Sequence, residues 1–595
     1  LNNTGSNQLY TLTSGFYSDL DPVFDTSGNF LALLSYRNFS PTYGDIDTTF
    51  VYSDSMVVSI IALTAGVELP TTPNWSAPEG VKTVEIDLQD AEARLAVLPL
   101  PPGQYGALTF QPGAVTVAKT GAEGGFNQVL RLELNAKEPE SLFEGPIGKV
   151  FEANETSTII KTRDDKLLQV VAKPKQEAQE IQTAKLIARV DRQAEYLQMF
   201  DDSWRYQRDF YYDPGLHGVD WEARRDHYRP QAAAAHSDQE LTAIIRELHG
   251  ELAAGHVYVS TEPPYNRRDA KDVGMLGIDF AIKDNAYVIS KILKPGARQY
   301  QHRSALDNPA LNVSEGNYLL AVNGMELSTR HSPWEPFAGL ADQYVELTIA
   351  DSANGKNKRT LRVKTLTSER KLRELVWAED NRKFVDGASE NQIGYIYVPN
   401  TGTEGLNELM QAYRAQYHKK ALIIDERFNR GGALGDRFVE LLNRPPLAYF
   451  SSRNGADYPL PEYSHRGAKA MLINSWSYSG GDGFPFLFKA AAVGPLIGTR
   501  TWGGLIGPGM RMALVNGGFI SAPPQRVYDV KGQWAEGNEG EEPNIPVLND
   551  PGELARGHDQ QLDRALKLLL DEIDQMLPIR VPDYPARSPD PSTME

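Results

Sequence analysis

Three serines lie within five residues in the stretch INSWSYSGGDGFPF, residues 473–486. A serine nucleophile needs a sharp strand-to-helix turn that exposes its hydroxyl, and backbone amides at the helix N-terminus that stabilise an oxyanion. The apolar run before the serines and the glycines after them provide this setting. Ser479 fits the turn best because two glycines follow it directly, whereas Ser475 and Ser477 lie closer to the strand. The stretch indicates either a catalytic serine or an ordinary loop between a strand and a helix.

The same serines do not fit an α/β-hydrolase. That fold places its nucleophile in Gly-x-Ser-x-Gly and its histidine later in the chain. Neither Ser477 nor Ser479 lies in such a motif, and His558, the only histidine after them, belongs to a charged helical run. A histidine partner must therefore come from upstream.

His256 is the histidine best placed to act as a base. Most of the ten histidines occupy polar or loop settings, whereas His256 follows Gly255 at a predicted helix end and enters the apolar stretch VYV. Packing can hold its ring there while one nitrogen faces a cleft. The alternative is a hydrogen-bonded core histidine.

A second loop, ALIIDERFNRGGALGD at residues 421–436, places two glycines shortly after a predicted buried strand. Backbone amides can converge on a ligand at such a point, so Gly431 or Gly432 could supply an oxyanion donor. A Gly-Gly pair before a helix is also an ordinary tight turn.

The elements that position these residues alternate in the C-terminal part of the chain. Apolar strands such as IGYIYVP, KALIIDERF and AMLINSW alternate with helical patterns between residues 366 and 578, which predicts an α/β subdomain with a partly parallel sheet. Residues 579–595 form a Pro-rich tail that we expect to be disordered or loosely draped.

The preceding regions differ from one another in pattern. Residues 1–175 repeat a strand–turn–strand unit typical of β-propeller blades, too few to close a ring. Residues 176–262 change to helical periodicity from about Glu177, with Ser237 predicted as an N-cap and a helix that ends near Gly255. Residues 263–365 are again β-rich, with Asn-Gly and Asp-Asn turns. Together these regions predict a multidomain α+β chain.

Composition excludes several classes of function. A net charge of −18 repels phosphate backbones and argues against nucleic acid, and no apolar run approaches the roughly 18 residues that cross a bilayer. The absence of cysteine excludes disulfides, thiolate metal sites and a cysteine nucleophile. The first residues lack the basic and apolar segments of a signal peptide, although upstream sequence could be missing.

The combined order of motifs resembles the tricorn protease family, serine peptidases related to C-terminal processing proteases. The motifs are His256, the RFNRGG loop, Ser479-Gly-Gly-Asp, GTRTWGGLIG at residues 498–507 and WAEGNEGEEPNIPV at residues 534–547. The resemblance covers essentially the whole chain. It implies a partial β-propeller, a helical catalytic subdomain, a PDZ-like β domain and an α/β catalytic subdomain, with most of the N-terminal propeller region absent.

The resemblance also implies roles for single residues. Ser479 would be the nucleophile of an endopeptidase that cleaves oligopeptides through an acyl-enzyme, and His256 the general base. Gly480 and Gly431 would donate backbone amides to the oxyanion, and no metal or other cofactor is needed. Family members often have a serine before the histidine that links it to a glutamate, and here that position is Gly255.

The glutamate itself is ambiguous. The position expected from the family falls on Gly537, so Glu536 is the favoured carboxylate and Glu539 the alternative, and both could instead be solvated loop acids. A catalytically degenerate peptide-binding scaffold of the same architecture is therefore the competing interpretation. The resemblance further implies oligopeptide partners, a homo-oligomer (a hexamer), and a cytoplasmic location, or a periplasmic one if a signal peptide lies upstream.

Overall fold

The computed structural model describes residues 2–577, except 4–7, 46–48, 71–74, 77, 81–83, 112, 122–123, 155–156, 172–176, 188, 262–271, 297–301, 434 and 536–538, and also residues 582–583. Most of the predicted Pro-rich tail therefore lies outside the described residues. The chain divides into two compact units, Leu1–Arg189 and Val190–Glu595.

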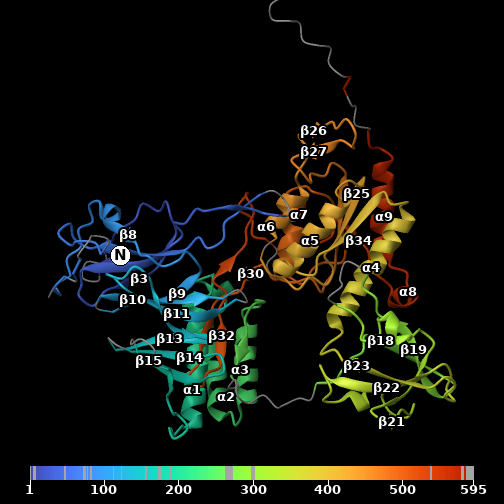
Figure 1. The fold of residues 1–595 in the computed structure, drawn as a ribbon, viewed down its shortest axis with the longest axis horizontal. Helices are drawn as coiled ribbons and strands as arrows, with labels where there is room; N and C mark the ends of the chain where they lie inside the picture. The colour runs from blue at the N-terminus through green and yellow to red at the C-terminus, as the bar shows by residue number, and fades with distance from the viewer. Residues whose placement is uncertain are drawn as a thin grey trace, which may run out of the picture. The chain divides into compact units, whose positions relative to one another are not determined.

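The first unit is built from antiparallel sheets (Figure 1). Three of them have four strands: β3(Asp19–Phe24), β4(Phe30–Ser35), β7(Val57–Ala62) and β8(Leu95–Val97); β9(Tyr105–Gln111), β10(Ala114–Thr120), β11(Phe126–Glu133) and β12(Glu140–Glu144); and β13(Ile147–Asn154), β14(Ser157–Thr162), β15(Leu167–Val171) and β16(Gln179–Glu180). Short pairs are β1(Asn2–Asn3) with β2(Gln8–Leu9) and β5(Thr42–Tyr43) with β6(Phe50–Val51), and η1 spans Ala91–Arg94. Consecutive four-stranded sheets are what the strand–turn–strand repeats predicted.

The second unit begins with three helices, α1(Arg192–Phe210), α2(Trp221–Ala234) and α3(Asp238–Gly250), with the turn η2(Leu216–Gly218) between the first two. Ser237 is the N-cap of α3, as predicted, and its Oγ accepts the N–H of Glu240 at 3.1 Å. The helical pattern expected from Glu177 is wrong at its start: residues 179–180 pair with β15, and α1 begins only after the Asp191 cap. The helix expected to end near Gly255 ends at Gly250.

An antiparallel sheet follows, in the order β18(Ile278–Lys283), β19(Ala286–Ile292), β20(Tyr318–Val322), β22(Tyr344–Ala350) and β23(Arg359–Lys364), with β21(Met325–Glu326) paired to β20. The turns η4(Pro309–Leu311) and η5(Glu335–Phe337) connect its strands. One apolar cluster fills it, including Ile278, Leu319, Phe337 and Leu347. This is the region predicted to be PDZ-like.

A parallel five-stranded sheet forms the C-terminal core, in the order β24(Ile393–Tyr397), β25(Ala421–Asp425), β28(Ala468–Ile473), β29(Leu496–Gly498) and β34(Ile545–Pro546). Alternate strand residues face two apolar clusters. One cluster includes side chains of α5(Thr403–Gln416), α6(Asp436–Leu442) and α7(Gly480–Ala490), and the other includes side chains of α4(Arg370–Ala388) and α9(Gln560–Ile573). The sheet is therefore sandwiched between helices, as the alternating pattern predicted.

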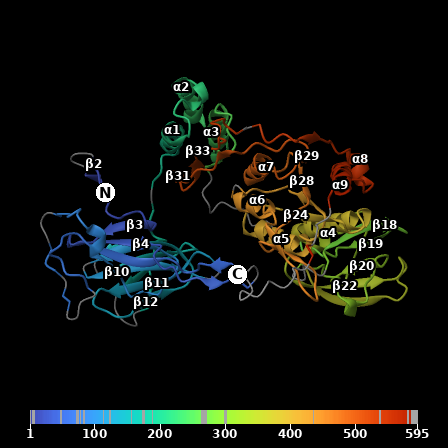
Figure 2. The same cartoon turned by 90° about the horizontal axis from the view of Figure 1, so that it is seen from above.

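A late segment of the chain returns to the first helices. Strand β32(Phe519–Ser521) lies between β17(Val259–Ser260) and β31(Arg511–Ala513), and Ile520 is buried in the core of α1–α3. Figure 1 shows β32, and Figure 2 shows β31, beside these helices. The remaining elements are β26(Ala448–Phe450), β27(Tyr458–Leu460), β30(Ile506–Gly507), β33(Gln525–Arg526) and α8(Pro551–Ala555). The segment after residue 500 thus connects the parallel sheet to the region that contains His256.

Candidate active site

Ser479 lies at the turn between β28 and α7. Its backbone adopts φ 60° and ψ −112°, a conformation that costs energy for any residue other than glycine. The N–H groups of Asp482 and Gly483 donate to its carbonyl at 2.8 and 3.0 Å, which holds the turn closed. Gly480 is the first residue of α7, so its N–H is one of those that a helix leaves without an intrahelical acceptor. A half-buried hydroxyl therefore stands at the positive end of a helix.

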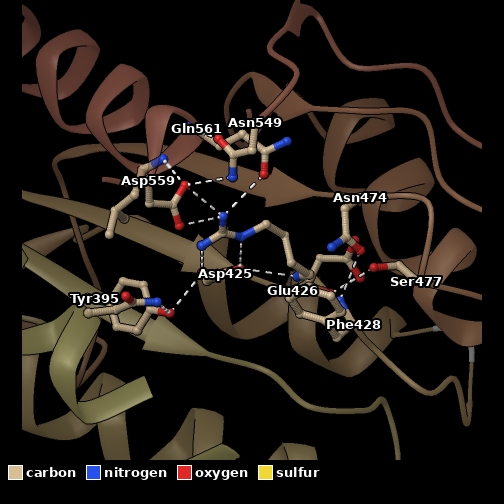
Figure 3. A network of polar contacts seen from close by, with 12 residues as sticks. Tyr395, Asp425, Glu426, Phe428, Asn474, Ser477, Asn549, Asp559 and Gln561 are labelled. Atoms are coloured by element: carbon tan, nitrogen blue, oxygen red, sulfur yellow. Dashed lines mark hydrogen bonds and ion pairs between the residues drawn. The ribbon is translucent and has the colours of Figure 1, made fainter. Parts of the chain in front are cut away.

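The other two serines have different surroundings. Ser477 is fully buried, and its Oγ donates to the carbonyl of Glu426 at 2.9 Å (Figure 3). Ser475 is exposed. The hydroxyl of Ser477 thus joins two loops, whereas Ser479 is the half-buried serine at the start of α7.

The RFNRGG loop lies directly against the nucleophile turn. Asn474 Oδ1 accepts the N–H of Phe428 at 3.1 Å, and the N–H of Tyr478 donates to the Asn429 carbonyl at 3.1 Å. Gly431 has φ +76°, and a Cβ there would lie 2.9 Å from Ser479 Cβ. The N–H of Gly431, however, donates to Asn429 Oδ1 at 2.9 Å, so this predicted oxyanion donor is already occupied in this conformation.

A buried ion pair anchors the start of this loop. The Arg427 side chain donates to Asp425 from Nε at 2.9 Å and from Nη2 at 2.6 Å, and to Asp559 at 2.7 Å (Figure 3). Tyr395 donates its hydroxyl to Asp425 at 2.7 Å. These contacts form a buried polar network that joins β24, β25 and the N-cap of α9 beneath the candidate site.

His256 follows α3 and lies just before β17. The residue is only 4% exposed, and its Nδ1 is 2.7 Å from the hydroxyl of Tyr258. Nε2 is buried and has no hydrogen-bond partner among the described residues. Burial lowers the pKa of His256, and the backbone of Gly504 opposes that effect in part. The ring is therefore neutral near pH 7, as a general base must be.

Asp482 links the nucleophile helix to the segment that covers His256. Its buried carboxylate accepts the Thr501 hydroxyl at 2.6 Å and the N–H groups of Gly503 and Gly504 at 2.7 Å each. A Cβ at Gly504 would lie 2.8 Å from the Ser479 nitrogen. The Gly504 backbone therefore lies beside Ser479. The same backbone opposes the lowering of the His256 pKa.

The Trp502 ring packs beside His256 and beside the residue that precedes Ser479. Its ring centroid is 6.5 Å from that of His256 and 6.3 Å from that of Tyr478, the residue before the nucleophile. His256 and Ser479 therefore border one segment, Trp502–Gly504. Sequence reasoning noticed the TWGG motif but assigned no role to Asp482 or Tyr258, since only the folded chain brings Asp482 to residues 501–504.

The described hydrogen bonds of His256 include no carboxylate, and a carboxylate partner stays a prediction. Glu539 is exposed, and Glu536 lies outside the described residues. At Gly255, a Cβ would lie 3.0 Å from the Trp502 ring, so a serine there requires the ring to move. The described side chain within hydrogen-bond distance of the His256 ring is Tyr258, whose hydroxyl meets Nδ1.

A cavity of about 530 Å³ opens beside the nucleophile turn. Its lining combines aromatic side chains with arginines: Trp377, Tyr397, Phe428, Trp476, Tyr478, Arg370, Arg373 and Arg430, with Glu374. Phe428 has φ +66°, an unusual conformation for a bulky residue, and Trp476 is 70% exposed. Exposed aromatic rings around a cavity at the carboxyl edge of a parallel sheet are typical of a ligand site.

Glu426 is a buried acid beneath the nucleophile turn. Neither of its carboxylate oxygens has a hydrogen-bond partner among the described residues. Burial, followed by the neighbouring Asp482 and Asp425 carboxylates, raises its pKa well above the usual value. The folded protein therefore holds a proton on Glu426 that the unfolded chain releases above pH 4.5.

This proton predicts a pH-dependent effect of Glu426→Gln. With wild-type Glu426, the stability that the bound proton provides is complete below pH 4.5 and is lost as the pH rises through the raised folded pKa. We therefore compare the unfolding free energy of the variant with that of wild type by urea denaturation at both pH values. The difference should favour the variant by about 1–3 kcal/mol more at pH 8 than at pH 4.5. For Glu440→Gln, an exposed control, the difference in unfolding free energy from wild type should not change between these pH values. An equal change in both variants would contradict a protonated Glu426.

The parts of the chain that the structure describes contain no helix long and apolar enough to span a membrane, and no group of three or more acidic or histidine side chains arranged to hold a metal ion.

Three family models match separate parts of the chain: the tricorn protease C1 domain at residues 192–250, the tricorn protease PDZ domain at residues 274–368, and peptidase family S41 at residues 392–547. The second match confirms the PDZ-like prediction for the antiparallel sheet. The third includes the nucleophile turn and the RFNRGG loop.

Similar proteins include tricorn protease homolog 1 of Streptomyces coelicolor, 28% identical over 594 residues that cover 94% of this chain and 55% of the relative. Tricorn protease of Thermoplasma volcanium is 26% identical over 580 residues, 95% of this chain and 56% of the relative. A crystal structure of the tricorn protease superposes with a TM-score of 0.85 at 24% identity, covering 96% of this chain and 56% of that one. The chain thus spans about half the length of these relatives, and the predicted multidomain α+β fold is confirmed.

Proposed function

Since the chain belongs to the tricorn protease family, with C1, PDZ and peptidase S41 domains, we propose that it is a serine peptidase that cleaves oligopeptides through an acyl-enzyme. The observation that carries this proposal is the backbone of Ser479. A serine held at φ 60° between a parallel strand and a helix N-terminus has the strained turn that presents a nucleophile.

In the proposed reaction, Ser479 Oγ attacks the scissile carbonyl while His256 Nε2 accepts the hydroxyl proton. The carbonyl oxygen becomes an oxyanion, which the N–H of Gly480 stabilises by about 3 kcal/mol. His256 then gives its proton to the leaving amine, the C–N bond breaks, and an ester to Ser479 remains. Water, deprotonated by His256, hydrolyses that ester and restores the hydroxyl.

Gly431 is the proposed second oxyanion donor. Its N–H must first leave Asn429 Oδ1, so we expect a small rearrangement of the loop when substrate binds. Apo geometry of this kind does not exclude a role, because catalytic hydrogen bonds often form only in the substrate complex. Glu536, or Glu539 as the alternative, remains a predicted partner of His256, and homo-oligomeric assembly and a cytoplasmic location remain predictions from the resemblance.

A peptide-binding scaffold without catalysis is the second candidate function. Two observations favour it: Gly255 has no side chain to relay a hydrogen bond to His256, and Glu539 is exposed. A scaffold would still use the aromatic cavity beside residue 478 to hold a peptide.

An active-site-directed fluorophosphonate separates the two candidates. We expect covalent labelling at Ser479, located by peptide mass mapping, lost in Ser479→Ala, strongly reduced in His256→Ala and retained in the control Ser475→Ala. Labelling should be slow in His256→Ala because the serine then lacks its base. Tight binding of peptides with no labelling of the wild-type chain would support the scaffold instead.

A further inference from the structure

We propose that Tyr258 is the positioning residue of His256: its hydroxyl oxygen accepts a hydrogen bond from Nδ1–H, both in the neutral ring and in the imidazolium that forms when Nε2 deprotonates Ser479. The role of the pair in catalysis rests on the proposed peptidase function. The pairing itself rests on the geometry of residues 256–258 alone.

The contact is short and specific. The Tyr258 hydroxyl oxygen lies 2.7 Å from His256 Nδ1, and the two rings meet edge to face with centroids 5.7 Å apart. With Nε2 as the base, the neutral ring carries its proton on Nδ1, and a tyrosine hydroxyl oxygen can accept a hydrogen bond from that N–H. The same bond persists in the imidazolium, so the Tyr258 oxygen accepts from Nδ1–H in both protonation states while the lone pair of Nε2 is free to take the serine proton.

Strand β32 fixes this pair from behind. The Tyr258 N–H donates to Ser521 Oγ at 2.9 Å, and Ser521 Oγ donates to the His256 carbonyl at 3.0 Å. The Ser521 N–H also donates to the Tyr258 carbonyl at 2.9 Å. Three hydrogen bonds to one residue therefore hold the backbone of both His256 and Tyr258, so the hydroxyl is presented to the ring from a rigid support.

The site leaves little room for a different orienting group at residue 255. A Cβ there would already lie 3.0 Å from two atoms of the Trp502 ring, and that ring packs on His256. A side chain at residue 255 would therefore press on the Trp502 ring, which would have to shift by a few tenths of an ångström. Tyr258 approaches instead from the strand, and its ring, 47% exposed, leaves its hydroxyl proton free to bind water when the oxygen accepts from Nδ1.

Tyr258 is an uncharged hydrogen-bond partner of His256 near pH 7. Burial and Tyr478 raise the pKa of Tyr258, opposed by Arg511 on β31, so its hydroxyl remains protonated near pH 7. The Asp482 carboxylate, which bonds the segment beside His256, is engaged by residues 501–504. A neutral acceptor stabilises imidazolium less than a carboxylate does. The acidic limb of the pH profile of kcat/KM should therefore lie below the ordinary histidine pKa of 6.5.

Tyr258→Phe tests the proposal because it removes one oxygen and keeps the ring. We expect kcat to fall about tenfold with KM nearly unchanged, and the acidic limb of the kcat/KM profile to move to lower pH, since the imidazolium loses its acceptor. Tyr344→Phe, at an exposed tyrosine on β22 of the PDZ-like sheet, is the matched control and should change neither kcat nor the limb. A Tyr258→Phe variant with an unchanged limb would overturn the proposal.

A second measurement does not depend on catalysis. In a Ser479→Ala chain labelled with ¹⁵N-histidine, the His256 resonances, assigned with His256→Gln, should titrate about one pH unit lower after Tyr258→Phe, and the Nδ1 shift should change. If the chain cleaves no peptide, this titration still decides the Tyr258 contact. If Ser479→Ala abolishes activity but Tyr258→Phe leaves the His256 titration unaltered, the proposed peptidase function stands. The positioning role of Tyr258 is then refuted.

Discussion

Ser479→Ala is expected to lower kcat for cleavage of an oligopeptide by about 10⁴-fold or more, and His256→Ala by a similar factor. In the proposed mechanism the Ser479 hydroxyl oxygen forms the acyl-enzyme bond, and without the imidazole the hydroxyl proton has no acceptor at neutral pH. The small residual rate should come from the helix N-terminus and from substrate binding, which both variants retain. Initial rates with an internally quenched peptide, corrected for contaminating protease, measure these factors.

The double variant gives the sharper result. Ser479→Ala with His256→Ala should be no slower than either single variant, because residues that act in one proton transfer lose their joint contribution with the first substitution. Ser475→Ala, an exposed serine of the same loop, should retain wild-type kcat. If the two single effects multiplied in the double variant, Ser479 and His256 would act independently, and the proposed dyad would be wrong.

The strongest sequence predictions depended on local signals. The Ser479 turn followed from a strand, glycines and a helix within a dozen residues, and the structure places this serine between β28 and α7. The Ser237 cap was correct for the same reason, since capping needs only residues three positions apart. Such features are encoded in short stretches and can be read without the fold.

Features set by tertiary contacts were predicted less well. The helical pattern from Glu177 failed because residues 179–180 pair with β15, a contact that periodicity does not reveal. The early end of α3 after Gly250 likewise moved the helix exit away from His256.

The polar contacts of the site were also beyond the sequence. Asp482 reads as an ordinary acid in the first turn of a helix, yet it binds residues about twenty positions later. Tyr258 reads as part of an apolar strand, and only the folded chain shows that its hydroxyl meets His256 while its backbone bonds Ser521. Side-chain partners of this kind depend on distances that no single-sequence pattern contains.

Arg427→Met is expected to destabilise the second unit by about 3–5 kcal/mol. Arg427 is 2% exposed, and its guanidinium binds Asp425, Asp559 and Gln561. Methionine retains much of the buried volume but leaves the fully buried Asp425 carboxylate without its cation. Urea unfolding followed by tryptophan fluorescence should show an earlier transition, and peptidase activity should fall because the RFNRGG loop begins at this residue. Arg437→Met, which removes an exposed pair with Glu440, should change stability by less than about 1 kcal/mol.

A second substitution identifies the cause of that loss. If the uncompensated charge of Asp425 dominates, Asp425→Asn should recover part of the stability of Arg427→Met, because a neutral amide oxygen can still accept the hydroxyl of Tyr395. If lost packing dominates instead, the double variant should be no more stable than Arg427→Met alone. The charge explanation predicts recovery because burying an unpaired carboxylate costs more than burying an amide that keeps one hydrogen bond. The same comparison shows whether the buried network beneath the site needs the ion pair or only side chains that fill the same volume.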